Sequence, residues 1–138
     1  MADKALLVGI NKYKSIGALN GCLNDVENLQ NLLINDFGFD EANIEKLVEE
    51  KAVYTNIQDG LMRLIKQAEE GDRLVFHFSG HGSFIDSEND DEAVDELLCL
   101  YDMDWDSPDS YLVDDDLGAL LEDVKPVSYT HLTLPTKA

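Results

Sequence analysis

The residue of this sequence best suited to chemistry is His81, which stands between two glycines directly after an apolar run. Residues 74–78 have the composition of a buried strand, and Ser79, Gly80, His81 and Gly82 follow them. An imidazole titrates near neutral pH, so it can take a proton from a nucleophile and pass it to a leaving group. Glycines on both sides leave room for a substrate to approach. The pattern indicates an acid–base residue, and a surface histidine in a tight turn is the alternative.

An acidic stretch in the second half of the chain is the next group of interest. The sequence has 29 acidic and 10 basic side chains and a formal net charge of −19, and no lysine or arginine occurs from Leu74 to Val124. This charge argues against nucleic acid or anionic membranes as partners. The carboxylates could form a solvated loop or bind a cation. An EF-hand loop that starts at Asp102 is excluded. Ser107 stands where such a loop requires glycine, and Val113 stands where it requires its closing glutamate.

Both cysteines of the chain, Cys22 and Cys99, have apolar neighbours. Two thiols do not make a disulfide framework, and the longest apolar run, residues 5–10, is far too short to span a bilayer. No secretory signal precedes it. We therefore expect a cytoplasmic protein with reduced thiols and no contact with a membrane.

Strand patterns alternate with helical patterns along the chain. Such alternation predicts an α/β fold with a mostly parallel sheet that has helices on both faces. Ligands of such folds bind beyond the carboxyl ends of the strands, which is where the glycine-flanked His81 should lie. The strand patterns cover residues 5–10, 44–48, 74–78 and 97–101, and the helical patterns cover residues 24–37, 55–68 and 114–124.

The last residues differ from the rest of the chain. Residues 127–136 lack the charge and the apolar periodicity of what precedes them, and they read like one frame of a translated sequencing adapter. A short genuine strand is the alternative. We interpret residues 127–138 as a non-native tail and residues 1–126 as the partial domain.

Five segments give the chain a family resemblance. Their order and spacing are similar to the large-subunit region of caspase-like cysteine peptidases, in particular the metacaspases and their bacterial relatives. The resemblance implies a caspase-like fold that is truncated before the strand carrying the nucleophilic cysteine. The segments are residues 8–13, 19–26, 76–82, 94–98 and 112–117.

The resemblance assigns roles to four residues. His81 would be the base of a Cys–His dyad, and the backbone N–H of Gly82 would stabilise the oxyanion of the tetrahedral intermediate. Asp25, with Ser79 near it, would lie in the primary specificity pocket and select a substrate arginine or lysine. The alternative for Asp25 is a carboxylate that only favours the first turn of a helix.

The nucleophile of this family does not occur in the sequence. A caspase-type cysteine lies about 50 residues after its histidine, which falls near residue 131 in the atypical tail. Neither Cys22 nor Cys99 stands in the Asp-x-Cys-His context of the family. Because a histidine alone cannot form the acyl-enzyme, we predict that the chain by itself is inactive.

The resemblance also implies a calcium site. Its ligands would be Asp95, Asp114 and Asp115, with one further ligand beyond the missing cysteine, and hard carboxylate oxygens suit calcium. The alternative is that Asp114 caps the last helix. No organic cofactor is expected, since no glycine-rich phosphate loop follows the first strand. His77 and His81 do not suggest zinc, because their spacing fits a metal pair only on a helix.

Together these observations predict part of a cysteine endopeptidase domain. Its substrate would be a polypeptide with a basic residue before the scissile bond. The alternative is a catalytically inactive caspase-like scaffold, or an acidic calcium-binding interaction module.

Overall fold

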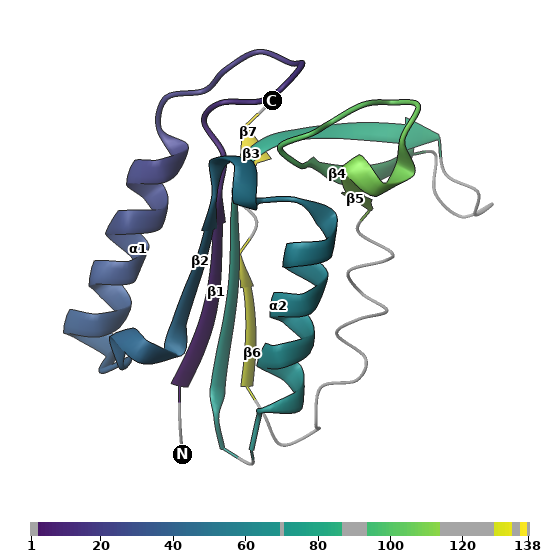
Figure 1. Ribbon diagram of the computed structural model, residues 1–138. Helices are drawn as coiled ribbons and strands as arrows, with labels where there is room; N and C mark the ends of the chain where they lie inside the picture. Colours follow the sequence, from purple (N-terminus) through teal and green to yellow (C-terminus); the bar gives the residue numbers. More distant parts are fainter. Residues whose placement is uncertain (1–2, 70, 87–93, 114–128, 134–135, 138) are drawn as a thin grey trace.

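The computed structural model describes residues 3–69, 71–86, 94–113, 129–133 and 136–137, and shows a mixed sheet flanked by helices (Figure 1). The helices are α1 (Cys22–Phe37) and α2 (Tyr54–Lys66), with short 3-10 helices at Glu41–Asn43, Glu49–Lys51 and Pro108–Ser110. The strands are β1 (Asp3–Gly9), β2 (Ile44–Val48), β3 (Arg73–Asp86), β4 (Val94–Cys99), β5 (Tyr111–Val113), β6 (Tyr129–Thr133) and β7 (Thr136–Lys137).

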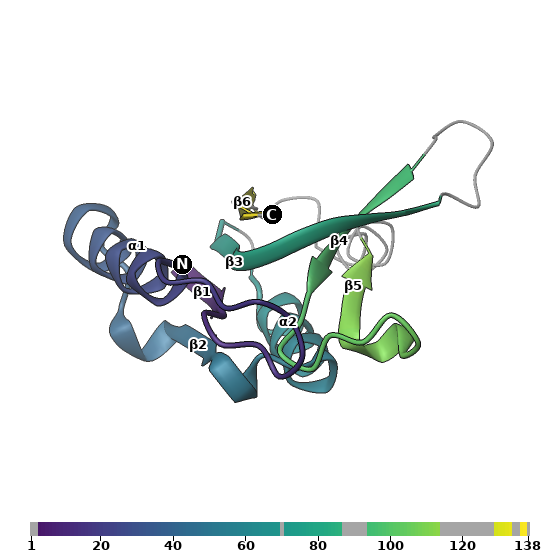
Figure 2. The same cartoon turned by 90° about the horizontal axis from the view of Figure 1, so that it is seen from above.

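Strand β1 is buried on both faces, and its alternate side chains pack against different helices. Leu6 and Val8 belong to an apolar cluster with Leu61 of α2, whereas Leu7 belongs to a second cluster with Val26 of α1. Figure 2 shows α1 and α2 on opposite sides of the sheet. The period of two along the strand thus confirms the predicted helical layers on both faces.

Strand β3 is the long central strand, and it changes partners along its length. From Arg73 to Ser79 it pairs in parallel with β1, whose other neighbour is β2. From Gly82 to Asp86 it pairs antiparallel with β4, which in turn pairs antiparallel with β5. The strand therefore belongs to two differently directed parts of one sheet.

The prediction of a mostly parallel sheet is correct for the strands before β4 and wrong for β4 and β5. Only residues 87–93 separate β3 from β4, and a parallel partner would need a crossover of about a dozen residues or more. Residues 97–101, expected as the fourth strand, overlap β4 only in part. The expected helix at residues 114–124 lies outside the described residues.

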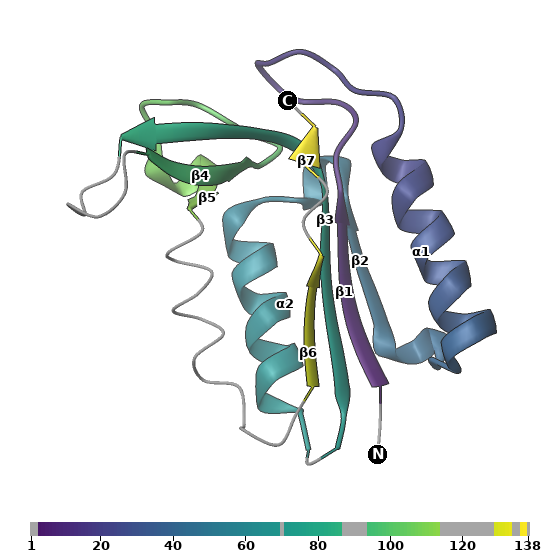
Figure 3. The same ribbon diagram turned by 180° about the vertical axis from the view of Figure 1, so that it is seen from behind.

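Residues of the atypical tail form β6, which lies beside β3 on the edge away from β1 (Figure 3). Residues 129–133 of this strand pair in parallel with residues 73–77 of β3. Pairing does not reveal the origin of these residues, so the division into a domain at 1–126 and a non-native tail at 127–138 stays a prediction. Within the described ranges, no helix has the length and apolarity that crossing a membrane requires.

A glycine at the end of β1 lets α1 approach the sheet closely. A Cβ placed on Gly9 would lie 2.6 Å from Cγ2 of Val26 and 3.1 Å from the carbonyl oxygen of Cys22. Both atoms belong to the first turns of α1. The absent side chain of Gly9 therefore sets how near the start of α1 comes to the carboxyl ends of β1 and β3.

We expect Gly9→Ala to destabilise the fold by about 1–3 kcal/mol, because the new methyl group overpacks this contact. Gly17→Ala is the matched control, since a Cβ there meets no atom within 4 Å. Chemical denaturation of both variants measures the difference. Equal stability of the two variants would contradict a close contact between Gly9 and α1.

Candidate active site

The candidate site lies where β3 changes partners, at the carboxyl end of β1. The last bond from the β1 side joins the N–H of Ile10 to the carbonyl of Ser79, at 3.0 Å. The first antiparallel pair with β4 is Gly82 with Leu98. His81 stands between these two points. The expected glycine-flanked turn is thus part of a continuous strand: β1 and β2 end here as expected, whereas β3 continues to Asp86.

The imidazole of His81 is oriented by a backbone carbonyl. Its Nε2 lies 2.7 Å from the carbonyl oxygen of Gly17, in the loop that connects β1 with α1. A carbonyl oxygen only accepts hydrogen bonds, so this contact requires the proton on Nε2. The lone pair of the neutral ring is then on Nδ1. His81 is partly buried, and Nδ1 is the nitrogen that can act as a base.

Tyr13 contacts both the backbone and the ring of His81. Its hydroxyl accepts a hydrogen bond from the His81 N–H at 2.8 Å and donates one to the carbonyl of Cys99 at 3.0 Å. The two ring centroids are 5.0 Å apart, with the planes tilted by 49°. Burial raises the pKa of Tyr13 well above its ordinary value, so the hydroxyl keeps the proton that it donates.

The structure brings Asp25 and Ser79 together although 54 positions separate them. The Ser79 hydroxyl donates to Oδ2 of Asp25 at 2.8 Å. Asp25 lies in the first turn of α1 and is partly buried, and Ser79 is fully buried on β3. The start of α1 is held by Asn11, whose side-chain oxygen accepts the N–H of Cys22 at 2.8 Å. The Asp25 carboxylate is thereby fixed beside Ser79, which stands two positions before His81 on β3.

His77 is a buried histidine that the sequence did not mark as part of a site. Its side chain is 5% exposed, and neither ring nitrogen has a hydrogen-bond partner among the described residues. Burial lowers its pKa, and the charge of Asp25 acts in the opposite direction. Burial has the larger effect, so the neutral ring is favoured.

The two cysteines are both in the core. Cys22 is 0% exposed and Cys99 is 3% exposed. Burial raises the pKa of the Cys99 thiol to about 11, which disfavours the thiolate that attacks a carbonyl. Neither thiol has the exposed setting of a nucleophile.

The expected calcium ligands fall largely outside the described residues. Asp95 lies on β4, paired with Ile85 of β3, whereas Asp114 and Asp115 are not described. Elsewhere in the described part of the chain, no cluster of three or more His, Cys, Asp or Glu residues could hold a metal ion. The calcium site stays a prediction.

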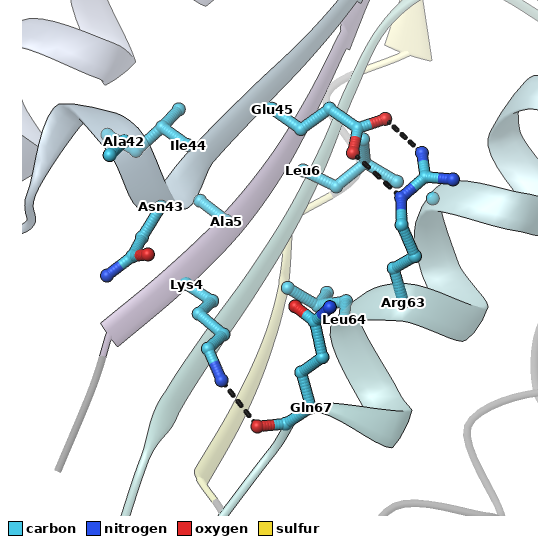
Figure 4. A pocket seen from close by; sticks show the side chains of 11 residues that line it. Lys4, Ala5, Leu6, Ala42, Asn43, Ile44, Glu45, Arg63, Leu64 and Gln67 are labelled. Carbon is cyan, nitrogen blue, oxygen red and sulfur yellow. Dashed lines mark hydrogen bonds and ion pairs between the residues drawn. The ribbon is translucent and has the colours of Figure 1, made fainter.

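A separate cavity lies at the other end of the sheet. It has a volume of about 330 Å³ and lies between α2 and the first residues of β1 and β2 (Figure 4). Its charged side chains have partners: Arg63 binds Glu45 at 2.7 Å, and Lys4 donates to the carbonyl oxygen of Gln67. The cavity is remote from His81 and presents no unpaired charge to a ligand.

Sequence reasoning missed the contacts that orient His81. Gly17 contacts His81 through its backbone carbonyl. Every residue has such a carbonyl, so nothing in the sequence distinguishes Gly17 as a partner of His81. Tyr13 offered a weak signal, since it is an aromatic residue with a polar tip that stands between Lys12 and Lys14. The pairing of Asp25 with Ser79 had been inferred only from the resemblance.

Comparisons with known proteins agree on one family. Residues 3–134 match the family described as "Metacaspase, peptidase C14 domain". Metacaspase-7 of Arabidopsis thaliana is 39% identical over 132 residues, which cover 90% of this chain and 31% of that protein. Metacaspase-1 of Eremothecium gossypii is 34% identical, with 91% of this chain and 28% of that protein covered. The chain thus spans about a third of the length of these relatives.

A solved structure supports the same fold. The crystal structure of a Geobacter sulfurreducens protein superimposes with a TM-score of 0.82 at 26% identity. The superposition covers 99% of this chain and 50% of that protein.

We expect Cys22 and Cys99 to resist a thiol reagent in the native chain and to react once the chain is unfolded, because both are buried. Labelling with Ellman's reagent, with and without guanidinium, measures this difference. Single Cys22→Ser and Cys99→Ser variants assign each reaction. Fast native labelling of one thiol that slows in His81→Ala would instead identify a reactive cysteine in the site.

Proposed function

We propose, since this chain belongs to the metacaspase family of C14 peptidases, that it forms the histidine-bearing part of a cysteine endopeptidase. The observation that carries the proposal is the contact between Nε2 of His81 and the carbonyl of Gly17. It leaves Nδ1 as a base at the carboxyl end of β1, where α/β folds bind their ligands.

In the proposed reaction, Nδ1 of His81 takes the proton of a cysteine thiol, and the thiolate attacks the carbonyl carbon of the scissile peptide. The His81 imidazolium then gives its proton to the leaving amine as the C–N bond breaks. Water hydrolyses the thioester and regenerates the thiol. The Gly17 carbonyl stabilises the imidazolium by accepting from Nε2–H throughout.

The backbone of Gly82 is suited to bind the oxyanion. Successive N–H groups of a strand point to opposite edges, and the N–H of His81 points toward β4 through Tyr13. The N–H of Gly82 therefore points to the other edge of β3, where β7 pairs with Gly80 and His81 in this structure, so that an oxyanion would take the place of β7. In the proposed reaction this N–H donates to the oxygen that becomes negatively charged.

Asp25 supports a preference for basic substrates. Its carboxylate is fixed by Ser79 on the strand that carries His81, and a substrate guanidinium or ammonium would form charge-assisted hydrogen bonds with it. The proposed substrate is a polypeptide with arginine or lysine before the scissile bond. The acidity of the chain would favour the approach of such a substrate.

In this proposal the nucleophile comes from outside this sequence. Its two cysteines are buried, and no cysteine follows Cys99. We therefore propose that the chain alone is inactive and that a longer protein containing residues 1–126 supplies the cysteine. The alternative is a caspase-like scaffold, or an acidic calcium-binding module, that never acquires one.

Calcium is the proposed ion of the acidic stretch. Asp95, Asp114 and Asp115 offer hard oxygen donors, and no lysine or arginine between residues 74 and 124 competes for them. This donor set fits calcium in its chemistry. A bound ion would offset part of the negative charge of this region.

The first test is peptidase activity. We expect the 138-residue chain to release no fluorophore from peptides ending in arginine or lysine, with or without calcium, because it has no exposed thiolate. The longer protein should cleave them. Turnover by the short chain that disappears in His81→Ala would contradict the missing nucleophile, whereas turnover that persists would reveal a contaminant. Inactivity of a longer protein that has the cysteine would favour the scaffold.

The second test concerns specificity in the longer protein. Asp25→Ala should lower kcat/KM for arginine substrates, because the substrate cation loses its partner. The expected loss of transition-state stabilisation is about 2–5 kcal/mol. Asp36→Ala, an exposed carboxylate of the same helix, is the matched control and should change little. Steady-state kinetics with arginine and neutral substrates measures the effect. An equal loss on both substrates would show that Asp25 supports the fold and not the pocket.

A further inference from the structure

Along one edge, β3 pairs first with β1 and then with β4, and a short stretch between the two pairings has no strand partner among the described residues. On this edge the carbonyl of Ser79 accepts the N–H of Ile10, and the pairing with β4 begins at Gly82 and Leu98. The N–H of His81 lies between these two places and faces the same edge as the Ser79 carbonyl. If the β4 ladder continued by one residue, His81 would stand opposite Cys99.

The hydroxyl of Tyr13 occupies this gap. It accepts the N–H of His81 at 2.8 Å and donates to the carbonyl of Cys99 at 3.0 Å. These two backbone groups would bond to each other in an uninterrupted ladder. The hydroxyl therefore replaces one rung of the sheet and satisfies both groups.

The close approach of Tyr13 explains a glycine of the site. A Cβ on Gly80 would lie 2.5 Å from the Tyr13 hydroxyl oxygen, nearer than real Cβ atoms come, and 3.0 Å from Cζ of Phe78. Tyr13 therefore leaves no room for a side chain at position 80, whereas the sequence suggested that this glycine makes room for a substrate.

The loop that carries Tyr13 is anchored at several points. Oε1 of Glu49 accepts the N–H of Asn11 at 2.7 Å, and Glu49 has a φ of 54°, in the left-handed region that non-glycine residues rarely adopt. The N–H of Lys14 bonds to the carbonyl of Tyr101 at 3.0 Å. The same loop presents the Gly17 carbonyl to the His81 ring. One anchored loop therefore holds both the backbone and the imidazole of His81.

We propose that Tyr13 is a positioning residue for His81, with its hydroxyl acting as a substitute rung that fixes the backbone of the catalytic base. The role of His81 as the base rests on the proposed function. The substitute rung itself does not, so it can be tested in a chain that lacks the nucleophile.

The first experiment uses NMR on the full 138-residue chain. In Tyr13→Phe, amide exchange at His81 should become on the order of ten-fold faster, the factor that one net hydrogen bond contributes. The His81 ring should also change from the Nε2–H tautomer to a mixture, because its backbone no longer holds it against Gly17. Tyr54→Phe is the matched control, since Tyr54 lies on α2 and its hydroxyl has no hydrogen bond among the described residues.

Both readouts have outcomes that overturn the proposal. Unchanged exchange and an unchanged tautomer in Tyr13→Phe would show that the hydroxyl does not position His81. Faster exchange with an unchanged tautomer would restrict Tyr13 to a structural role. Neither readout depends on turnover, so an inactive longer protein would refute the proposed function and leave this result standing.

The second experiment is a double-mutant cycle between Tyr13 and Gly80. Gly80→Ala should lower the melting temperature of the wild-type chain more than that of Tyr13→Phe, because removal of the hydroxyl leaves only the 3.0 Å contact with Phe78. Asp36→Ala in the same two backgrounds is the control, since Asp36 is exposed in the last turn of α1 and belongs to neither contact. Additive losses for Gly80→Ala and Tyr13→Phe would contradict the close approach on which the proposal depends.

Discussion

Every buried N–H and C=O group needs a partner, and along β3 different strands meet this requirement in turn. This strand runs without interruption from the parallel part of the sheet into the antiparallel part. Along one of its edges the hydrogen-bonding partner therefore changes from β1 to β4. The two partners do not meet, and the space between them falls at His81. The loop after β1 fills that space with a tyrosine hydroxyl and, a few residues later, with a carbonyl against the imidazole. The geometry of the site follows from how the sheet satisfies its hydrogen bonds.

Packing on the α1 face of the sheet places the second half of the site. The missing side chain of Gly9 allows the first turns of α1 to touch the end of β1, and Asn11 accepts the N–H of Cys22, the first residue of that helix. Asp25 thereby comes within hydrogen-bond distance of Ser79. The apolar clusters above and below β1 hold this arrangement, because they join α1 and α2 to the same strand.

The sequence predicted those features that repeat along an element. The continuous apolar run of β1 and the apolar stripes of the helices were enough to infer an α/β fold with helices on both faces. The direction of β4 was not, because the chemistry of a strand does not state whether its partner is parallel. The tyrosine rung and the Gly17 contact also escaped, since they join residues more than 60 positions apart and Gly17 takes part only through its backbone carbonyl. His81 was singled out by its glycine-flanked position after a strand pattern, Asp25 and Ser79 were found through the family resemblance, and the roles of all three remain predictions.

The hydrogen bond between Asp25 and Ser79 joins the first turn of a helix to a central strand, and neither element has to form when a ligand arrives. A cation that reaches this carboxylate therefore meets a preorganised partner, whose conformational entropy was already lost during folding. Loops that close around a ligand lose that entropy on binding, and their affinity falls accordingly. Selectivity for a basic side chain at this position would thus depend on the rigidity of the sheet as much as on the charge itself.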